Sequence, residues 1–129
     1  MSMEIKPKSG ATSSNTWVID RGEIKPKSGA NSNNTWKIGS DRIEPKYGAS
    51  SSNRCKLSRD GFSCSFGEFK FDGKYFSPKH SSSSQDVLII ERGEIKPKNG
   101  ATSSNTFVYD IGIEPLIVAF VYLLSQKKS

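Results

Sequence analysis

Lysines at a fixed spacing are the side chains of this sequence best suited to bind a ligand. They flank a proline in near-identical copies of one segment, first at Lys6-Pro7-Lys8 and again at Lys25-Pro26-Lys27. The full band of lysines is Lys6, Lys8, Lys25, Lys27, Lys46, Lys96 and Lys98. A band of ammonium groups attracts phosphates on anionic lipid or on nucleic acid. The band is therefore the candidate ligand-binding site, and a solvated, solubilising face is the plain alternative.

Cys55 and Cys64 are the one specific pair of reactive side chains. The hairpin pattern described below places them directly opposite each other on neighbouring strands. In a reducing compartment the two thiols are expected to pack there as small apolar groups. A disulfide between them is the alternative, and it requires an oxidising compartment and suitable geometry.

Signatures of catalysis and of metal binding are missing from the sequence. His80 is the only histidine, and two cysteines with one distant histidine match no zinc spacing. The serines lack a Gly-x-Ser-x-Gly segment, and no glycine pattern for phosphate or dinucleotide binding occurs. We therefore expect no enzyme activity, no metal and no cofactor. The aspartates that recur at one turn position are explained as turn formers: Asp20, Asp60, Asp72 and Asp110.

The overall composition predicts one small basic domain, residues 1–129. Apolar residues make up 33% of the chain and charged residues 25%, and the formal net charge is +6. A basic balance of this kind favours contact with phosphates. The first sixteen residues are polar and contain no apolar segment of a secretory signal. A cytoplasmic location is expected, with peripheral attachment to a membrane if the lysine band binds lipid.

A repeat of nineteen residues determines the expected architecture. The segment Glu4–Ala11 returns as Glu23–Ala30 and again as Glu94–Ala101, and a diverged copy runs from Ile43 to Ala49. Repetition this close indicates one small unit that was duplicated and placed side by side.

Each unit has the pattern of a β-hairpin: apolar, any, apolar, a turn, then apolar, any, proline. With Asp20–Glu23 as a four-residue loop, Ile19 faces Ile24 and Trp17 faces Pro26 on one side of the hairpin. The same pattern predicts further hairpins at Trp36–Pro45, Cys55–Cys64, Phe69–Pro78, Leu88–Pro97 and, with a shorter loop, Phe107–Pro115.

Hairpins in series predict about twelve short antiparallel strands over residues 3–114. Each proline is expected at the end of a strand, because proline cannot donate to the ladder. Polar connectors such as Ser9–Asn15 are expected to be surface turns in which Gly10 has a positive φ.

The apolar segment Leu116–Leu124 predicts a helix over residues 115–126, with Pro115 at its first position. About ten helical residues span roughly 15 Å, half of a bilayer core, so a membrane anchor is the weaker alternative. A helix that is apolar on all sides is usually buried on all sides. We therefore expect a mainly β fold whose strands close around this helix and leave no exposed sheet edge.

The expected layout resembles the tubby-like barrel family, which includes the phospholipid scramblases. The hairpin Val18–Ile24 is similar to the hydrophobic-Asp-x-Gly hairpins of that family, and Pro115–Phe120 resembles the start of its central helix. In layout the resemblance covers the whole chain, and in motif only these two stretches. The short strands and near-identical repeats depart from the family's pattern. The resemblance implies a barrel around a central helix and, by analogy, phosphoinositide binding or lipid movement.

These observations favour a non-catalytic β-repeat protein that binds anionic lipid or membrane surfaces through its lysine band. Two alternatives remain open at this point. One is a structural or protein-interaction scaffold, and the other is non-specific binding of nucleic-acid phosphates.

Overall fold

Short segments of alternating apolar residues form the strands of a closed barrel. A computed structural model describes residues 3–12, 15–31, 34–48, 54–64, 67–79, 87–102 and 105–127. Neighbouring strands pair antiparallel in the closed order β1-β12-β11-β10-β9-β8-β7-β6-β5-β4-β3-β2, which confirms the predicted mainly β fold. The strands are β1 (Met3–Pro7), β2 (Trp17–Asp20), β3 (Glu23–Pro26), β4 (Trp36–Ile38), β5 (Arg42–Pro45), β6 (Cys55–Ser58), β7 (Gly61–Cys64), β8 (Gly67–Phe71), β9 (Tyr75–Pro78), β10 (Leu88–Glu91), β11 (Glu94–Pro97) and β12 (Phe107–Tyr109).

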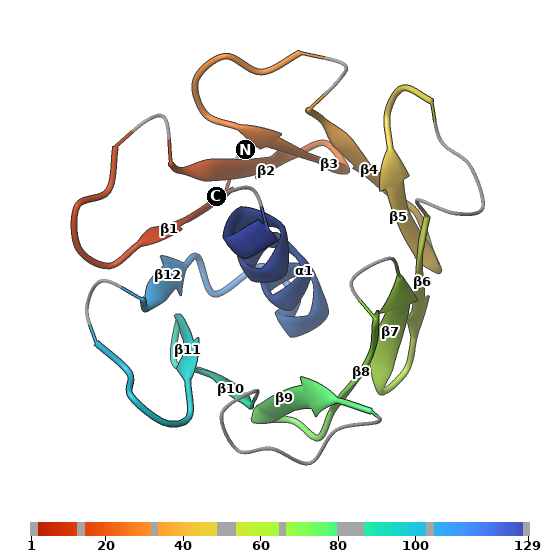
Figure 1. Cartoon of the computed structure of the whole chain (residues 1–129). Coiled ribbons are helices and arrows are strands. Elements are labelled where there is room, and N and C mark those ends of the chain that lie inside the picture. Colours follow the sequence, from red (N-terminus) through yellow and green to blue (C-terminus); the bar gives the residue numbers. More distant parts are fainter. Residues whose placement is uncertain are drawn as a thin grey trace.

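The C-terminal helix α1 (Pro115–Lys127) lies inside the ring of strands (Figure 1). Every residue from Ile117 to Tyr122 is buried. The strands surround the helix and shield all of its apolar faces from solvent. The helix begins at Pro115 as predicted and extends one residue beyond the predicted end at 126. No helix in the described part of the chain is long and apolar enough to cross a bilayer.

The predicted facing pairs occur in the ladders between the strands. Ile19 pairs with Ile24, and Trp17 pairs with Pro26 at the end of β3. Proline also ends β1, β5, β9 and β11, as its missing N–H requires. The corresponding pairs in the other predicted hairpins are Trp36 with Pro45, Leu57 with Phe62, Phe69 with Pro78 and Leu88 with Pro97.

The turn between β2 and β3 is shorter than predicted. Asp20 and Glu23 pair within the ladder, so the loop contains only Arg21 and Gly22. Their φ angles are 52° and 76°, the positive values of a type I′ turn. This turn matches the right-handed twist of the two strands, so the strands continue further than a four-residue loop would allow.

The sixth predicted hairpin, Phe107–Pro115, is wrong. Strand β12 pairs instead with β1, and Phe107 faces Pro7 while Tyr109 faces Ile5. Pro115 begins α1, and Ile113 is buried but outside any strand. The N-terminal half-repeat therefore supplies the second strand of the sixth hairpin. This pairing leaves neither end of the sheet with an unpaired edge.

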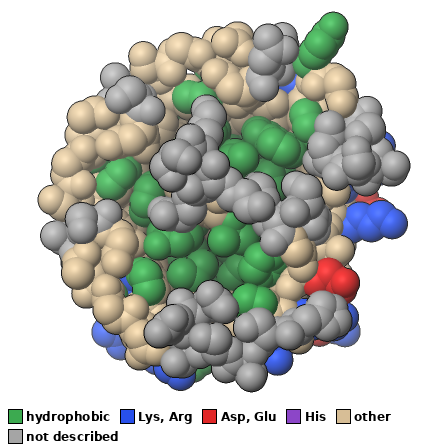
Figure 2. Space-filling model, viewed as in Figure 1, with side chains coloured by type: hydrophobic (Ala, Val, Ile, Leu, Met, Phe, Trp, Pro, Cys, Tyr) green, Lys and Arg blue, Asp and Glu red, His purple; other side chains and the backbone are tan. Residues whose placement is uncertain are grey.

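One position of the hairpin is deeply buried in every copy around the barrel. This position is the inward-facing residue two places before the proline or cysteine that ends each second strand, and it is almost fully buried: Ile5, Ile24, Ile43, Phe62, Phe76 and Ile95. These side chains face α1 from all directions. In the space-filling view, apolar side chains fill the inside of the ring, and lysine and arginine side chains lie at its circumference (Figure 2).

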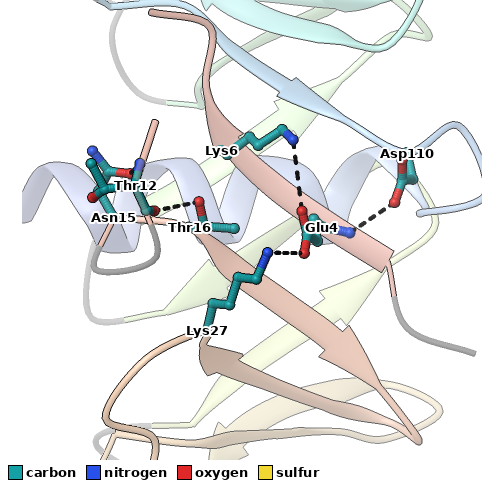
Figure 3. Close-up of polar contacts among 7 residues, drawn as sticks. All are labelled: Glu4, Lys6, Thr12, Asn15, Thr16, Lys27 and Asp110. Atoms are coloured by element: carbon teal, nitrogen blue, oxygen red, sulfur yellow. Dashed lines mark hydrogen bonds and ion pairs between the residues drawn. The ribbon is translucent and has the colours of Figure 1, made fainter. Parts of the chain in front are cut away.

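Three connectors share one hydrogen-bond pattern in their described residues. The Asn15 side chain accepts a bond from the backbone N–H of Thr12 and donates to the carbonyl of Gly10. The buried Thr16 hydroxyl donates to the carbonyl of Thr12 at 2.6 Å (Figure 3). The same bonds form around Asn34 and around Asn105. As predicted, Gly10 has a positive φ, 74°.

Candidate functional site

The lysine band lies on the outer wall of the barrel. Lys6, Lys25 and Lys96 alternate with the inward-facing isoleucine and the terminal proline of their strands, so their side chains point outward. Lys8, Lys27, Lys46 and Lys98 follow the proline that ends each strand, and all four are exposed. The repeat thus places two rows of lysines on the wall, one in the strands and one at their ends.

The lysines at the strand ends bind glutamates of neighbouring hairpins. Lys27 Nζ lies 2.9 Å from Glu4 Oε2, and Lys6 Nζ approaches the other oxygen of the same carboxylate, Oε1, at 3.7 Å (Figure 3). Equivalent bridges join Lys46 to Glu23 at 3.1 Å and Lys8 to Glu94 at 2.9 Å.

Lys98 makes a different contact at the same place. Its partner position holds Tyr75 instead of a glutamate, and the Lys98 ammonium lies 4.9 Å from the centre of the Tyr75 ring. A cation above an aromatic face is attracted to it. The lysines at the strand ends therefore link neighbouring hairpins even where the partner has changed.

The bridges alter the titration of the glutamates and neutralise much of the band. The hydrogen bond from Lys27 is the main cause that lowers the pKa of Glu4, and the bond from Lys8 does the same to the pKa of Glu94. An exposed ion pair stabilises a fold by about 0–1 kcal/mol. In the described part of the chain, every glutamate within a strand makes an ion pair: Glu4, Glu23, Glu44, Glu68, Glu91 and Glu94.

A belt of lysines runs around the middle of the barrel, one in each hairpin. In three hairpins the lysine stands on the second strand, opposite a valine or isoleucine, as Lys25 stands opposite Val18. In the other three it has moved to the first strand, as Lys37 stands opposite Glu44. The belt consists of Lys6, Lys25, Lys37, Lys56, Lys70 and Lys96.

Three of the six belt lysines were not predicted from the sequence. Lys37, Lys56 and Lys70 lie outside the repeated letters, because the lysine has changed strand there. An alignment of the hairpins by their apolar pairs, rather than by their letters, reveals the belt.

The lysines along one arc of the belt are not neutralised by ion pairs with described residues. Lys6 and Lys96 lie 3.7 Å and 3.6 Å from the glutamates of their own strands. Lys25, Lys37, Lys56 and Lys70 make no ion pair with the described residues, and they follow each other from β3 to β8. We call these four residues the lysine arc. Its net positive charge makes it the strongest candidate for binding an extended anion.

The two cysteines and the histidine add no defined site. Cys55 is buried, and the ladder that pairs Lys56 with Ser63 brings the backbones of Cys55 and Cys64 opposite each other. The Cys64 side chain and all of His80 lie outside the described residues, so the cysteine pair stays a prediction. Among the residues that the structure describes, no three His, Cys, Asp or Glu side chains cluster in a way that would hold a metal ion.

Comparison with known proteins identifies no relative. No protein-family model matches the chain, and no curated protein and no solved structure matches it.

Proposed function

We propose that this protein is a non-catalytic barrel that binds anionic membrane surfaces, and that the lysine arc is the binding face. The observation that carries the proposal is the arc itself: four neighbouring lysines that make no ion pair among the described residues, on a wall whose strand glutamates are all paired. Attachment would be peripheral, at the cytoplasmic side of a membrane.

The spacing of the arc suits attraction to a charged surface. Lys25 lies on β3, the strand beside β4. Lys37, Lys56 and Lys70 lie on every second strand, about 10 Å apart across the sheet, because neighbouring strands lie about 4.8 Å apart. This spacing is close to the Debye length of about 8–10 Å at physiological salt, so the fields of adjacent lysines add. At about 1 kcal/mol for each lysine near an acidic membrane, the four lysines together supply at most about 4 kcal/mol. The expected binding is weak, with a dissociation constant of about 1 mM or higher, and it depends on salt.

The layout of the fold also supports a lipid ligand. A closed antiparallel barrel around a C-terminal helix is the arrangement of the tubby-like family, and we include membership of that family in the proposal. The analogy concerns architecture, which many functions can share.

Nucleic acid is the second candidate, and the closed belt is the observation that favours it. Lys6 and Lys96 complete the ring around the barrel, so a flexible polyanion could follow the wall beyond the arc. A planar membrane reaches only one side of the barrel. Binding to nucleic acid should therefore need the whole belt, whereas binding to vesicles should need only the arc.

Flotation with lipid vesicles tests the proposal. We expect the protein to float with phosphatidylserine vesicles but not with neutral phosphatidylcholine vesicles. Salt of about 1 M should release it, because the Debye length then falls to about 3 Å. Replacing Lys37, Lys56 and Lys70 with Gln should abolish flotation.

The matched control removes the same formal charge from ion-paired lysines. Lys6, Lys8 and Lys96 replaced with Gln should leave flotation largely intact. Equal and negligible flotation of the wild-type protein with both kinds of vesicle would contradict the proposal. Equal losses in the two triple variants would show that net charge, rather than the arc, determines binding.

A further inference from the structure

The third copy of the repeat departs from the others in its charges. The Glu-Ile-Lys of residues 4–6 becomes Arg42-Ile43-Glu44, so the two charges have changed places. In the next hairpin, Arg54 stands where the first connector has a buried threonine, and Lys56 stands where β2 has a valine. The ladder between β5 and β6 brings these departures together, because Arg42 pairs with Lys56.

Glu44 orients two arginines in this cluster. Its Oε1 accepts a hydrogen bond from Nε of Arg42 at 2.9 Å and another from Nε of Arg54 at 3.0 Å. The terminal amino groups of both guanidinium groups are not used in these two bonds. Asp41 approaches one of them, with its Oδ1 at 3.6 Å from Arg42 Nη1. One carboxylate thus holds two guanidinium groups on the surface with donors still available.

A hollow adjoins the two arginines. It has a volume of about 320 Å³ and is lined by Asp41, Arg42, Arg54, Lys56 and Leu57. We call it the Arg42 cleft. A second hollow of about 330 Å³ on the other side of Arg42 carries two glutamates in its lining, so the Arg42 cleft is the more positive of the two.

Positive charge is in excess in the cleft, because one carboxylate in its lining, Asp41, stands against Arg42, Arg54 and Lys56. Arg42 and Lys56 are directly opposite across the ladder, and like charges in that position destabilise a sheet. The ion pairs of this cluster join Arg42 and Arg54 to Asp41 and Glu44, and none of those among the described residues includes Lys56. An anion in the cleft would join Lys56 to both arginines and relieve this repulsion.

We propose that the Arg42 cleft is a discrete site for a compact tetrahedral oxyanion, with a phosphate group as its ligand. Guanidinium groups bind phosphate through paired donors in a fixed plane, and Lys56 adds a point charge. This proposal deepens the proposed function, since the phosphate group of a lipid headgroup is one source of the ligand. A soluble phosphate compound is the other source.

Titration of the full chain with inorganic phosphate tests the site. We expect saturable shifts of the Arg42 and Arg54 Nε–H signals in nitrogen-15 NMR spectra. The decisive variant combines Arg42→Glu with Glu44→Lys. It restores the Glu-Ile-Lys of the other copies and leaves the net charge unchanged, so the barrel should fold. Its affinity for phosphate should fall at least tenfold.

The matched control exchanges the same charges at another place. Glu94→Arg combined with Lys96→Glu changes β11, away from β5 and β6, and should keep the phosphate affinity of the wild type. Absence of saturable shifts in the wild type, or equal affinity in the Arg42→Glu/Glu44→Lys variant and the wild type, would overturn the site.

Vesicles separate the two sources of phosphate and the two proposals. Preference for phosphatidic acid over phosphatidylserine, lost in the Arg42→Glu/Glu44→Lys variant, would identify a lipid phosphate as the ligand. Phosphate binding without vesicle binding would support the site with a soluble ligand and would overturn the membrane function. Vesicle binding without saturable phosphate binding would overturn the site and leave the membrane function standing.

Discussion

Lys27 shows how a single residue of the repeat can serve the barrel rather than a ligand. Its ammonium binds Glu4, a residue of the preceding hairpin, and Lys46 and Lys8 repeat this bridge at other junctions. Where Tyr75 replaces the glutamate, Lys98 keeps the junction through the aromatic ring. The second lysine of each Lys-Pro-Lys segment is therefore first a link between hairpins, and the middle lysines of the strands are the better candidates for a ligand.

Replacing Lys27 with Met should raise the pKa of Glu4 toward 4.5, its ordinary value, because Lys27 is the main cause of the lowered pKa. A carboxyl group with a lowered folded-state pKa stabilises the fold above its unfolded pKa, and this contribution is lost as the pH falls through the folded pKa. The wild type should therefore lose more free energy of unfolding than Lys27→Met between about pH 5 and about pH 3. NMR titration of the glutamate carboxyl carbons measures the pKa directly.

Glu94 provides the internal control for this prediction. Its pKa is lowered mainly by Lys8, so it should not change in Lys27→Met and should rise in Lys8→Met. An unchanged Glu4 pKa in Lys27→Met would show that the bridge is absent in solution. The expected loss of stability at neutral pH is small, about 0–1 kcal/mol for an exposed pair.

At the scale of elements, the hairpins could be predicted because their signals are local. Alternation identifies Ile19 and Ile24 as facing residues, and proline identifies the strand ends. The sixth hairpin could not be assigned in this way. Its strands β12 and β1 come from opposite ends of the chain, and no turn between them announces their pairing.

The length of the β2–β3 turn and half of the lysine belt could not be predicted from the sequence, for related reasons. Arg21 in a positive φ lacks the Asn-Gly or Asp-Gly letters typical of type I′ turns. Lys37 and Lys56 are conspicuous only after the strand register is known, because they keep the place of the lysine in the hairpin but not its place in the repeated letters. The charge exchange at Arg42 was visible in the sequence, but its partners on β6 depend on the pairing of β5 with β6.

The sixth hairpin, in which β12 pairs with β1 without a connecting turn, should be as stable as the other hairpins. Ile5 in β1 and Ile24 in β3 occupy the same position and are both fully buried. Ile5→Ala and Ile24→Ala should each lower the free energy of unfolding by about 2–5 kcal/mol, since both leave a core cavity. Denaturant unfolding measures the two values, and hydrogen exchange of the β12 amides shows whether the barrel still opens as one unit. A small effect of Ile5→Ala, with fast exchange confined to β1 and β12, would contradict equal closure.

At the scale of the whole molecule, the barrel and the helix form one core, in which the strands cover the apolar helix and the helix fills the interior of the barrel. The inward residues of the strands surround α1, and Phe120 packs against Trp36 and Phe62 with ring centres 5.1 Å and 6.3 Å away. The Tyr122 hydroxyl donates a hydrogen bond of 2.9 Å to the carbonyl of Asn105 and ties the helix to a connector. A barrel of strands this short has no other core in the described structure.

Truncation after Asp110 should therefore unfold the protein. It removes the buried residues Ile117 to Tyr122, each of which stabilises the fold by about 1.5–3 kcal/mol if large and apolar. Their sum is comparable with a total stability of about 5–15 kcal/mol. Loss of the strand signal in circular dichroism, or of a cooperative thermal transition, is the expected result.

Truncation after Ser125 is the control, because it keeps the buried part of α1 and should unfold cooperatively near the wild-type temperature. A soluble, cooperatively folded chain that ends at Asp110 would mean that the strands can close without the helix. The apolar helix would then be free to insert into a membrane, and the alternative that this segment is a membrane anchor would be favoured over its role as the core. Since the lysine arc is carried by the strands, such a chain should still float with acidic vesicles, and the flotation experiment would then separate the part of the protein that binds from the part that anchors.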